Sequence, residues 1–533
     1  MINFKKKGLF SKMPLIKNTR SKIAILACIS HLITFRVFSQ DSTNAYAARY
    51  PYLHTEFNMV QFYSRSALDT FYNCWNQSGN KKISMVHLGD SHLQSDIFPG
   101  RIRKSMHAIH GDGGRGIMFA YSTAKTYSSV EYRTTNTGEW LAARSLSPFP
   151  KLPLGVSGMT CKTLDSNSSL KFTFVNDVPA HYTKLKIFCQ KDSASYDMVV
   201  ECGGKFIPIV VDSSTTDSLS YYEIDLPPFK NEIVIRLKRT NKTENTFTFY
   251  GMSLEAPEDK GAIYHNCGVG GAKYESIINE VYFSEQLPAL NPDVVIIDFG
   301  TNDYLYDDSI KANEEENIIK VIHKVREAAP HASIILTSTM DMYYKGDHVQ
   351  SGEAFSDIIR KVAKAENCGF YDWYWVSGGW DVLPKFQSDQ LCNPDGVHMS
   401  PRGYRMKGSL MSEAMVGTID SIKTNPKIDS LIFPLAPIKL EQHLYKLRQD
   451  SDSVAVGPTV KVMHKIRKGE SLSVIAKKYH VTVNQLRKWN NMQSNLIRTG
   501  KYLVVYCDPK YKPKPKPKPK PKPTTTTTAP KPK

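Results

Sequence analysis

The sequence predicts an α/β protein with a parallel sheet, an inserted β-sandwich and a small βααβ unit near its carboxyl end. Apolar runs that end in short polar motifs indicate the parallel sheet, and short alternating runs after the first motif indicate the sandwich. A helix–helix pattern between two apolar runs, residues 461–506, indicates the small unit. At 533 residues and 41% hydrophobic composition, the chain is long enough for two or three domains with buried cores.

The parallel sheet is predicted from apolar runs that lead into polar turns. Residues 83–88 run into Gly89-Asp90-Ser91, and residues 294–297 lead to Gly300-Thr301-Asn302-Asp303. The second run is continuous rather than alternating, which is typical of a strand covered on both faces. The strand–helix rhythm continues through a helix at 314–328, a strand at 334–336, a helix at 354–366 and an aromatic segment at 370–375. A wound α/β domain over residues 41–124 and 257–425 is therefore predicted.

The segment 125–256 has a different pattern. Short runs of alternating apolar and polar residues recur there, separated by Asn, Asp, Ser and Pro, at residues 170–174, 185–189, 233–237 and 246–249. A decorated loop is the alternative, but structureless loops of this length are uncommon in compact domains. We expect an inserted β-sandwich, with carbohydrate binding as its candidate role.

Residues 461–506 predict a small βααβ unit after a linker at 426–460. A helical pattern follows Gly469-Glu470-Ser471-Leu472, and Thr482 to Gln485 has the spacing of a capping box before a second short helix. The apolar runs 462–466 and 502–505 can pair as two strands. The remaining residues, 507–533, are rich in Lys, Pro and Thr and predict an extended, solvated spacer, with adhesion to an acidic polymer as the alternative.

The amino terminus predicts export. Residues 1–39 combine a basic front with an apolar stretch that begins at Ile23 and small or apolar residues near a possible cleavage site after Ser39. A retained membrane anchor is the alternative, but His31 and Arg36 interrupt the run and a span needs about 20 apolar residues. We therefore expect no stable membrane span and a location in the periplasm, the cell envelope or the extracellular space.

The net charge of +18 does not indicate a nucleic-acid enzyme, because it is concentrated at the ends of the chain. The first 40 residues, the small unit and the tail are basic, which leaves residues 41–460 at about −7. A cleft for nucleic acid is expected to be positive. The nine cysteines contain no Cys-x-x-Cys pair, so neither a metal nor a cofactor is predicted, and any disulfide pairing stays open.

Four polar motifs together supply the groups that acyl transfer needs. Gly89-Asp90-Ser91 offers a hydroxyl nucleophile, and Asp395-Gly396-Val397-His398 offers a base with an orienting carboxylate. Gly300-Thr301-Asn302-Asp303 and the glycine-rich segment 266–271 offer donors for an oxyanion. Any one of these motifs alone would be weak evidence, but their joint order resembles the four blocks of SGNH (GDSL-type) hydrolases. The resemblance implies a flavodoxin-like hydrolase fold.

By that resemblance Ser91 is the nucleophile, His398 the general base and Asp395 the residue that orients the imidazole. The oxyanion hole comprises the backbone N–H groups of Ser91 and Gly271 and the side-chain amide of Asn302. Gly268 and Gly270 compete with Gly271 for this role, and only the family's block pattern selects Gly271. For His92 and Asp303 we expect structural hydrogen bonding.

The small unit resembles a LysM domain, a family that binds glycans containing N-acetylglucosamine, usually peptidoglycan. The resemblance covers the whole unit, and the glycan-binding residues that it implies are Gly469, Glu470, Ser471, Leu472, Asn490, Asn491 and Ile497. An exported serine esterase that removes O-acetyl groups from peptidoglycan is the predicted function. The alternatives are an esterase for other acylated polysaccharides or lipids and a non-catalytic cell-wall-binding protein.

Overall fold

The computed structural model describes residues 43–79, 81–146, 148–211, 220–452, 460–492 and 496–511. These residues belong to two compact units, Met1–Phe433 and Pro434–Lys533. The predicted signal sequence, residues 1–39, lies outside the described residues. So do residues 453–459 of the predicted linker and residues 512–533 of the predicted tail.

The first unit is built on a five-stranded parallel sheet, as predicted. Its strand order is β13-β1-β14-β15-β18, and every neighbouring pair is parallel. The strands are β1 (Ile83–Gly89), β13 (Ala262–Gly268), β14 (Val294–Asp298), β15 (Ser333–Thr337) and β18 (Gly369–Tyr371). All residues of these five strands are buried, which explains why their sequences do not alternate between apolar and polar residues.

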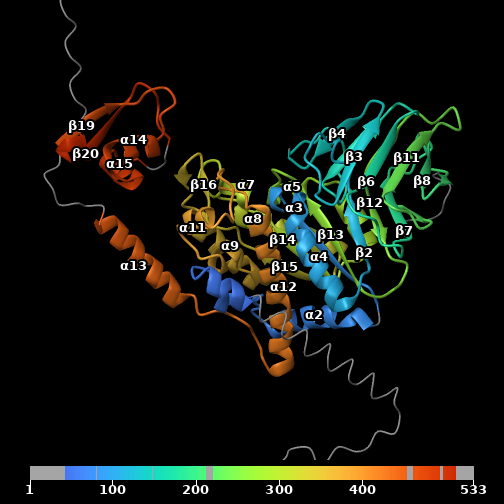
Figure 1. Ribbon diagram of the computed structural model, residues 1–533, viewed down its shortest axis with the longest axis horizontal. Coiled ribbons are helices and arrows are strands. Elements are labelled where there is room, and N and C mark those ends of the chain that lie inside the picture. Colours follow the sequence, from blue (N-terminus) through green and yellow to red (C-terminus); the bar gives the residue numbers. More distant parts are fainter. Residues whose placement is uncertain are drawn as a thin grey trace, which may run out of the picture. The chain divides into compact units, whose positions relative to one another are not determined.

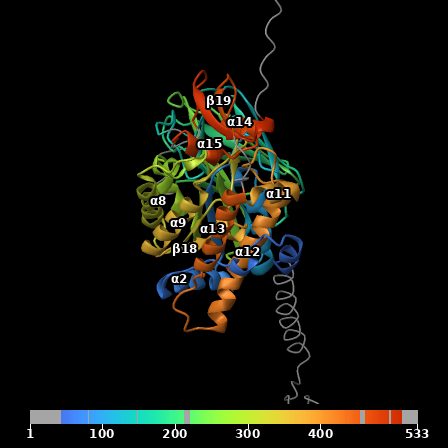
Figure 2. The ribbon, with the colours of Figure 1, turned by 90° about the vertical axis from the view of Figure 1, so that its left-hand side faces the viewer.

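Helices pack on this sheet in two groups. Helix α4 (Ile97–His110) packs against α12 (Pro401–Thr424), which also contacts α2 (Arg65–Trp75). Helix α8 (Glu314–Ala328) packs against α5 (Tyr274–Ile278) and α9 (Gly352–Ala365). Figure 2 shows α8 and α9 on one side of β18 and α12 on the other. The sheet is therefore covered on both faces, and helices α8 and α9 lie where the sequence predicts them.

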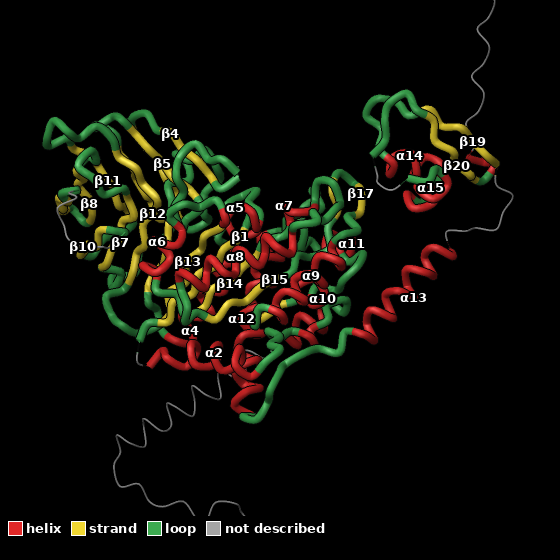
Figure 3. Tube along the Cα trace, turned by 180° about the vertical axis from the view of Figure 1, so that it is seen from behind, coloured by secondary structure: helices red, strands yellow, loops and turns green. Residues whose placement is uncertain are grey.

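Short elements complete this part of the unit. They are α3 (Ser91–Gln94), α6 (Phe283–Gln286), α7 (Thr301–Tyr304), α10 (Trp373–Val376), α11 (Leu383–Ser388), η1 (Thr55–Phe57), η2 (Asn76–Gly79), η3 (Leu287–Leu290), β16 (Tyr343–Tyr344) and β17 (Asp347–His348). Helices α3 and α7 directly follow the carboxyl ends of β1 and β14, so they place the first and third motifs at one edge of the sheet. Figure 3 shows α7 beside α5 at the upper end of this sheet.

Two antiparallel sheets form the predicted sandwich. One has the order β10-β7-β12-β5-β4 with β2 also paired to β12, and the other has the order β3-β6-β11-β8-β9. Phe172 of β6 and Phe249 of β12 are fully buried with ring centroids 6.3 Å apart, so the two sheets share an aromatic core. Figure 1 shows these strands as one block beside the parallel sheet. Their bounds are β2 (Gly114–Met118), β3 (Tyr132–Thr137), β4 (Leu141–Arg144), β5 (Met159–Thr163), β6 (Ser169–Phe174), β7 (Lys184–Cys189), β8 (Asp197–Cys202), β9 (Lys205–Ile209), β10 (Tyr222–Asp225), β11 (Glu232–Lys238) and β12 (Phe247–Glu255).

Two strands at the junction were not predicted. Strand β2 precedes residue 125, where the sequence places the start of the insert, yet it pairs with β12. Strand β13 contains the polar residues His265 and Asn266, which break the apolar pattern of a buried strand. His265 Nδ1 accepts a hydrogen bond from the Ile117 N–H at 3.2 Å, although its buried Nε2 has no partner among the described residues. Asn266 Nδ2 donates to the Leu93 carbonyl, and its Oδ1 accepts the Gly268 N–H. Burial of paired polar groups explains why the pattern fails there.

The second unit contains the predicted βααβ arrangement. Strands β19 (Val460–Lys465) and β20 (Tyr502–Cys507) pair antiparallel, and α14 (Leu472–Tyr479) and α15 (Val483–Trp489) lie between them in the sequence. The predicted capping box at the start of α15 is present, with reciprocal bonds between Thr482 and Gln485. Helix α13 (Ala436–Asp452) lies within the predicted linker, and the short helix η4 (Pro509–Tyr511) follows β20.

Candidate active site

Ser91 stands at the carboxyl end of β1, where the chain turns into α3. Asp90 caps this helix, since its Oδ1 accepts a hydrogen bond from the His92 N–H at 2.9 Å. Ser91 is the first residue of α3, so its N–H is among those that a helix leaves without an internal partner. The side chain lines a cleft of about 790 Å³.

The loop before α12 brings His398 to the serine. His398 Nε2 lies 2.9 Å from Ser91 Oγ, and His398 Nδ1 lies 2.8 Å from Asp395 Oδ2. The other carboxylate oxygen of Asp395 accepts the N–H groups of Val397 and His398, both at 2.9 Å. Partial burial would raise the pKa of Asp395, but these hydrogen bonds and the imidazole outweigh it and hold the pKa below its usual value. The carboxylate is thus held ionised beside the imidazole.

Asn302 belongs to α7 and lines the same cleft. Its Nδ2 donates to the Ala272 carbonyl at 3.0 Å and lies 3.4 Å from Asp90 Oδ2. Burial raises the pKa of Asp90 to about 7. The amide is therefore held between the loop that follows β13 and the turn that carries the serine.

The three candidate glycines differ in what their N–H groups do. The Gly268 N–H donates to Asn266 Oδ1 at 3.0 Å, and the Gly270 N–H donates to Gln94 Oε1 at 2.6 Å. Gly270 and Gly271 both line the cleft, and Gly271 has a φ of +91°, a conformation that favours glycine. The bonds of the Gly268 and Gly270 N–H groups favour Gly271 as the oxyanion donor, which stays a prediction.

His92 and Asp303 make internal hydrogen bonds next to these residues. His92 Nδ1 lies 3.0 Å from the Tyr404 hydroxyl, and burial lowers the pKa of His92 to about 3. Asp303 Oδ1 accepts the Tyr274 N–H at 3.2 Å, at the start of α5. His92 is neutral at physiological pH, so it contributes no charge to the site.

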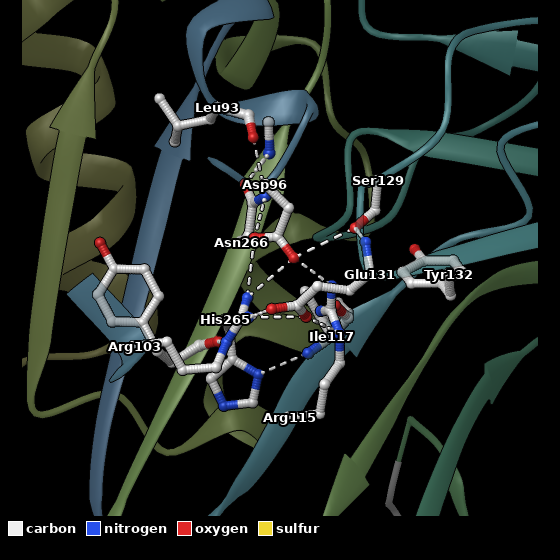
Figure 4. A network of polar contacts seen from close by, with 12 residues as sticks. Leu93, Asp96, Arg103, Arg115, Ile117, Ser129, Glu131, Tyr132, His265 and Asn266 are labelled. Carbon is white, nitrogen blue, oxygen red and sulfur yellow. Dashed lines mark hydrogen bonds and ion pairs between the residues drawn. The ribbon is translucent and has the colours of Figure 1, made fainter. Parts of the chain in front are cut away.

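A buried polar network supports the turn that carries Ser91 (Figure 4). Asn266 Nδ2 donates to the Leu93 carbonyl at 2.9 Å and to Asp96 Oδ1 at 3.0 Å. Asp96 is paired with Arg103 at 2.8 Å and also with Arg115 of β2. Burial would raise the pKa of Asp96, but the two guanidinium groups hold it below its usual value. The network joins the serine turn, the second motif and the sandwich.

The sequence did not reveal that the sandwich reaches the cleft. Gln94 is fully buried, and its Nε2 donates to Thr126 Oγ1 at 2.9 Å and to the Tyr127 carbonyl at 2.7 Å. The Tyr127 hydroxyl donates to the Ser91 carbonyl at 3.1 Å. Lys125 and Arg144 line the cleft as well. These residues carry no motif, and a glutamine three residues after a serine gives no specific signal.

In the second unit, several of the predicted glycan-binding residues hold the unit together. Leu472 is fully buried, and Ser471 Oγ accepts the Val474 N–H at 3.3 Å as the cap of α14. Glu470 Oε2 lies 2.9 Å from His464 Nε2 and accepts the Arg467 N–H at 2.7 Å. Asn490 Nδ2 donates to the Leu486 and Val504 carbonyls, and its Oδ1 accepts the Val504 N–H.

The other predicted glycan-binding residues are more open. Gly469 and Asn491 are exposed, and both have positive φ angles, of 86° and 50°. Ile497 is half-buried against the core of the unit. A cavity of about 410 Å³ in this unit is lined by His464, Tyr479 and neighbouring residues, and none of the seven predicted residues is among them. The glycan contacts of this unit stay a prediction.

Two family models match this chain. Residues 243–406 match the GDSL-like Lipase/Acylhydrolase family, and residues 464–505 match the LysM domain. The first match contains Gly271, Asn302, Asp395 and His398 but not Ser91, because the sandwich separates the first motif from the others. The chain thus carries a GDSL-like acylhydrolase domain of SGNH type and a carboxyl-terminal LysM domain.

Individual relatives are more distant. The solved structure of a peptidoglycan O-acetylesterase aligns with a TM-score of 0.56 at 18% identity, over 68% of this chain and 99% of that chain. This likeness shows the fold. A probable peptidoglycan endopeptidase, LytE of Bacillus subtilis (strain 168), is 33% identical over 86 residues, which are 13% of this chain and 24% of that protein. This chain thus spans about a quarter of the length of that relative.

Three further properties bear on chemistry and location. None of the helices in the described part of the chain has the length and apolar character that a membrane crossing requires. The described residues contain no cluster of three or more His, Cys, Asp or Glu side chains that could hold a metal ion. The eight described cysteines are all buried.

Proposed function

We propose that this protein is an exported serine esterase that removes O-acetyl groups from peptidoglycan. The observation that carries the proposal is the hydrogen-bonded series from Ser91 Oγ to His398 Nε2, at 2.9 Å, and from His398 Nδ1 to Asp395, at 2.8 Å. A serine hydroxyl is a weak nucleophile until a base removes its proton. The series supplies that base and the carboxylate that orients it.

In the proposed reaction, Ser91 Oγ attacks the ester carbonyl while His398 Nε2 takes the hydroxyl proton. The resulting tetrahedral oxyanion is stabilised by the N–H groups of Ser91 and Gly271 and by the Asn302 amide. His398 then gives its proton to the leaving sugar oxygen, which leaves an acetylated Ser91. Water, activated by the same imidazole, attacks that ester and releases acetate.

The substrate is inferred from the second unit and from the relatives. A LysM domain suits a polymer that contains N-acetylglucosamine, and the structural relative named above is a peptidoglycan O-acetylesterase. The cell wall is therefore the proposed place of action. Export rests on the sequence of residues 1–39 alone.

The esterase claim is tested by acetate release from a chromogenic acetyl ester and from O-acetylated peptidoglycan. Ser91→Ala is expected to lose about 10⁴-fold or more in turnover, because the nucleophile of a triad cannot be replaced. Glycan sedimentation should persist in this variant. Folded wild-type protein that releases acetate from neither substrate would overturn the proposal, and release from acetylated xylan alone would redirect it to other polysaccharides.

The LysM claim is tested separately by sedimentation with insoluble peptidoglycan. A chain that ends near residue 458 lacks the matched region and should lose sedimentation while it keeps hydrolysis of the chromogenic ester. Unchanged sedimentation would move glycan anchoring to the first unit.

A further inference from the structure

One wall of the cleft comes from the sandwich side of the first unit. Lys125, Thr126, Tyr127 and Arg144 line the cleft together with the motif residues. This wall is fixed to the catalytic turn, since Gln94 bonds to Thr126 and Tyr127 and the Tyr127 hydroxyl bonds to the Ser91 carbonyl. A substrate that reaches Ser91 therefore meets these side chains in a defined position.

The wall is basic although the surrounding region of the chain is acidic. Residues 41–460 carry a net charge of about −7. Among the residues that line the cleft, the two cations are Lys125 and Arg144, and Asp395 is the carboxylate. Asp395 is already paired with His398. The carboxylate in the cleft is therefore paired with His398 and not with Lys125 or Arg144.

Neither cation has an acidic partner within the described residues. No carboxylate there lies within 4.0 Å of Lys125 Nζ or of the Arg144 guanidinium, whereas Arg103 and Arg115 of the same unit are both paired. Arg144 is half-buried, and its Nη1 donates to Thr126 Oγ1 at 3.3 Å. That bond engages one of the five N–H donors of a guanidinium. Lys125 is exposed and has a φ of 52°, which is uncommon for a residue other than glycine.

We propose that Lys125 and Arg144 form a subsite for a carboxylate of the substrate, beside the acyl ester that Ser91 attacks. The inference rests on the proposed esterase function and narrows its substrate class to acylated glycans that carry an acid group near the acylated sugar. A planar guanidinium matches the two oxygens of a carboxylate, and an ammonium adds a second charge. The carboxylate belongs either to an acid substituent of the sugar itself or to a peptide attached to that substituent.

The test compares esters that differ only in this charge. The full chain is assayed for acetate release from the methyl glycoside of O-acetylated N-acetylmuramic acid and from its neutral carboxyl methyl ester. An O-acetylated muramyl dipeptide, whose acid lies on the peptide, is the third substrate. We expect kcat/KM to be about five- to twenty-fold higher for at least one of the acids than for the neutral ester, between the effects of an exposed ion pair and a charged hydrogen bond. Which acid is preferred identifies the source of the carboxylate.

The variant Lys125→Gln with Arg144→Gln should bring this ratio close to one, and 0.5 M salt should lower it in the wild type. Arg144→Lys keeps the charge and should keep most of the preference. Lys205→Gln is the matched control, because Lys205 is an exposed lysine on β9 that does not line the cleft. A wild-type ratio near one, or an unchanged ratio in the double variant, would overturn the subsite while esterase activity persists. Failure of the wild type to cleave any ester would overturn the proposed function and the subsite together.

Discussion

The two units use the polar residues of their sequence motifs in different ways. In the first unit, Ser91, Asn302 and His398 line a cleft, and Ser91 Oγ lies 2.9 Å from His398 Nε2 there. In the LysM unit, Glu470 bonds to the Arg467 N–H and to His464, and Asn490 bonds to the backbone of Val504. A match to a family pattern thus coincides with side chains that line a cleft in one unit and with side chains that bond to backbone groups in the other. Asn302 has both features, because its Nδ2 also donates to the Ala272 carbonyl.

The distance along the chain also differs between the units. Ser91 and His398 are separated by 307 residues, and the whole sandwich lies between them. The bonds within the LysM unit that involve Glu470 or Asn490 join residues at most 14 positions apart. The first site therefore depends on the correct assembly of the parallel sheet, whereas the LysM braces depend on local folding.

The largest effect on activity is expected from Asn302→Ala. The amide is proposed to stabilise the oxyanion, so its removal should lower kcat for a chromogenic acetyl ester by about 10² to 10³-fold. Asn279→Ala is the matched control, because its Nδ2 bonds only locally to the Glu275 carbonyl at the end of α5. Equal rates in both variants would reduce Asn302 to a brace of the kind found in the LysM unit.

Most of the parallel sheet was predictable because β1, β14 and β15 are mainly apolar runs, and β1 and β14 lead into polar turns. Strand β13 was not predictable, because His265 and Asn266 are polar yet buried and form hydrogen bonds through His265 Nδ1 and Asn266 Nδ2. The sandwich wall of the cleft was also missed, since Gln94 and Tyr127 act through contacts that join distant segments and leave no periodic pattern. In the LysM unit, a match to the spacing of the family pattern could not show which polar side chains form hydrogen bonds within the unit.

A second prediction concerns pH, which should affect the first unit more than the second. Burial lowers the pKa of three histidines in the first unit, His92 to about 3, His265 to about 3 and His110 to about 4. Burial raises the pKa of three acids, Asp90 to about 7, Glu280 to about 8 and Glu413 to about 7. The histidines and the acids therefore change the stability of the first unit in opposite directions as the pH rises.

Below pH 6.5, these histidines are protonated in the unfolded chain but stay neutral in the folded chain. The free energy of unfolding therefore falls as the pH drops towards 3 to 4. Above about pH 4, the three acids lose their protons in the unfolded chain but keep them in the folded chain. The free energy of unfolding therefore falls as the pH rises towards 7 to 8. The first unit should thus be most stable between about pH 4.5 and 6.5, with its Tm lower by about 5 °C or more outside that window. Hydrogen exchange read separately for each unit checks this, and a first unit as insensitive to pH as the LysM unit would contradict it.

A third prediction addresses the brace in the LysM unit. Asn490→Ala removes the partners of the Leu486 and Val504 backbone groups, so the free energy of unfolding of this unit should fall by about 1 to 3 kcal/mol. Esterase turnover should not change. Asn491→Gly is the matched variant, because the positive φ of Asn491 suits glycine and its stability should be nearly unchanged. If Asn490→Ala weakens sedimentation with peptidoglycan without a loss of protection from hydrogen exchange, Asn490 contacts the glycan directly.

The smallest effect is expected from Glu470→Gln, which keeps the shape of the side chain and removes its charge. Burial would raise the pKa of Glu470, but the Arg467 N–H and His464 outweigh it and hold the pKa below its usual value. The stabilisation by the carboxylate is therefore present above about pH 4.5 and lost as the pH falls through the lowered pKa. The variant should be less stable than the wild type by under about 1 kcal/mol at pH 7, and equally stable near pH 3. Denaturant unfolding at both pH values measures this difference, and a variant with normal stability that no longer sediments with peptidoglycan would make Glu470 a ligand contact, as the family pattern implies.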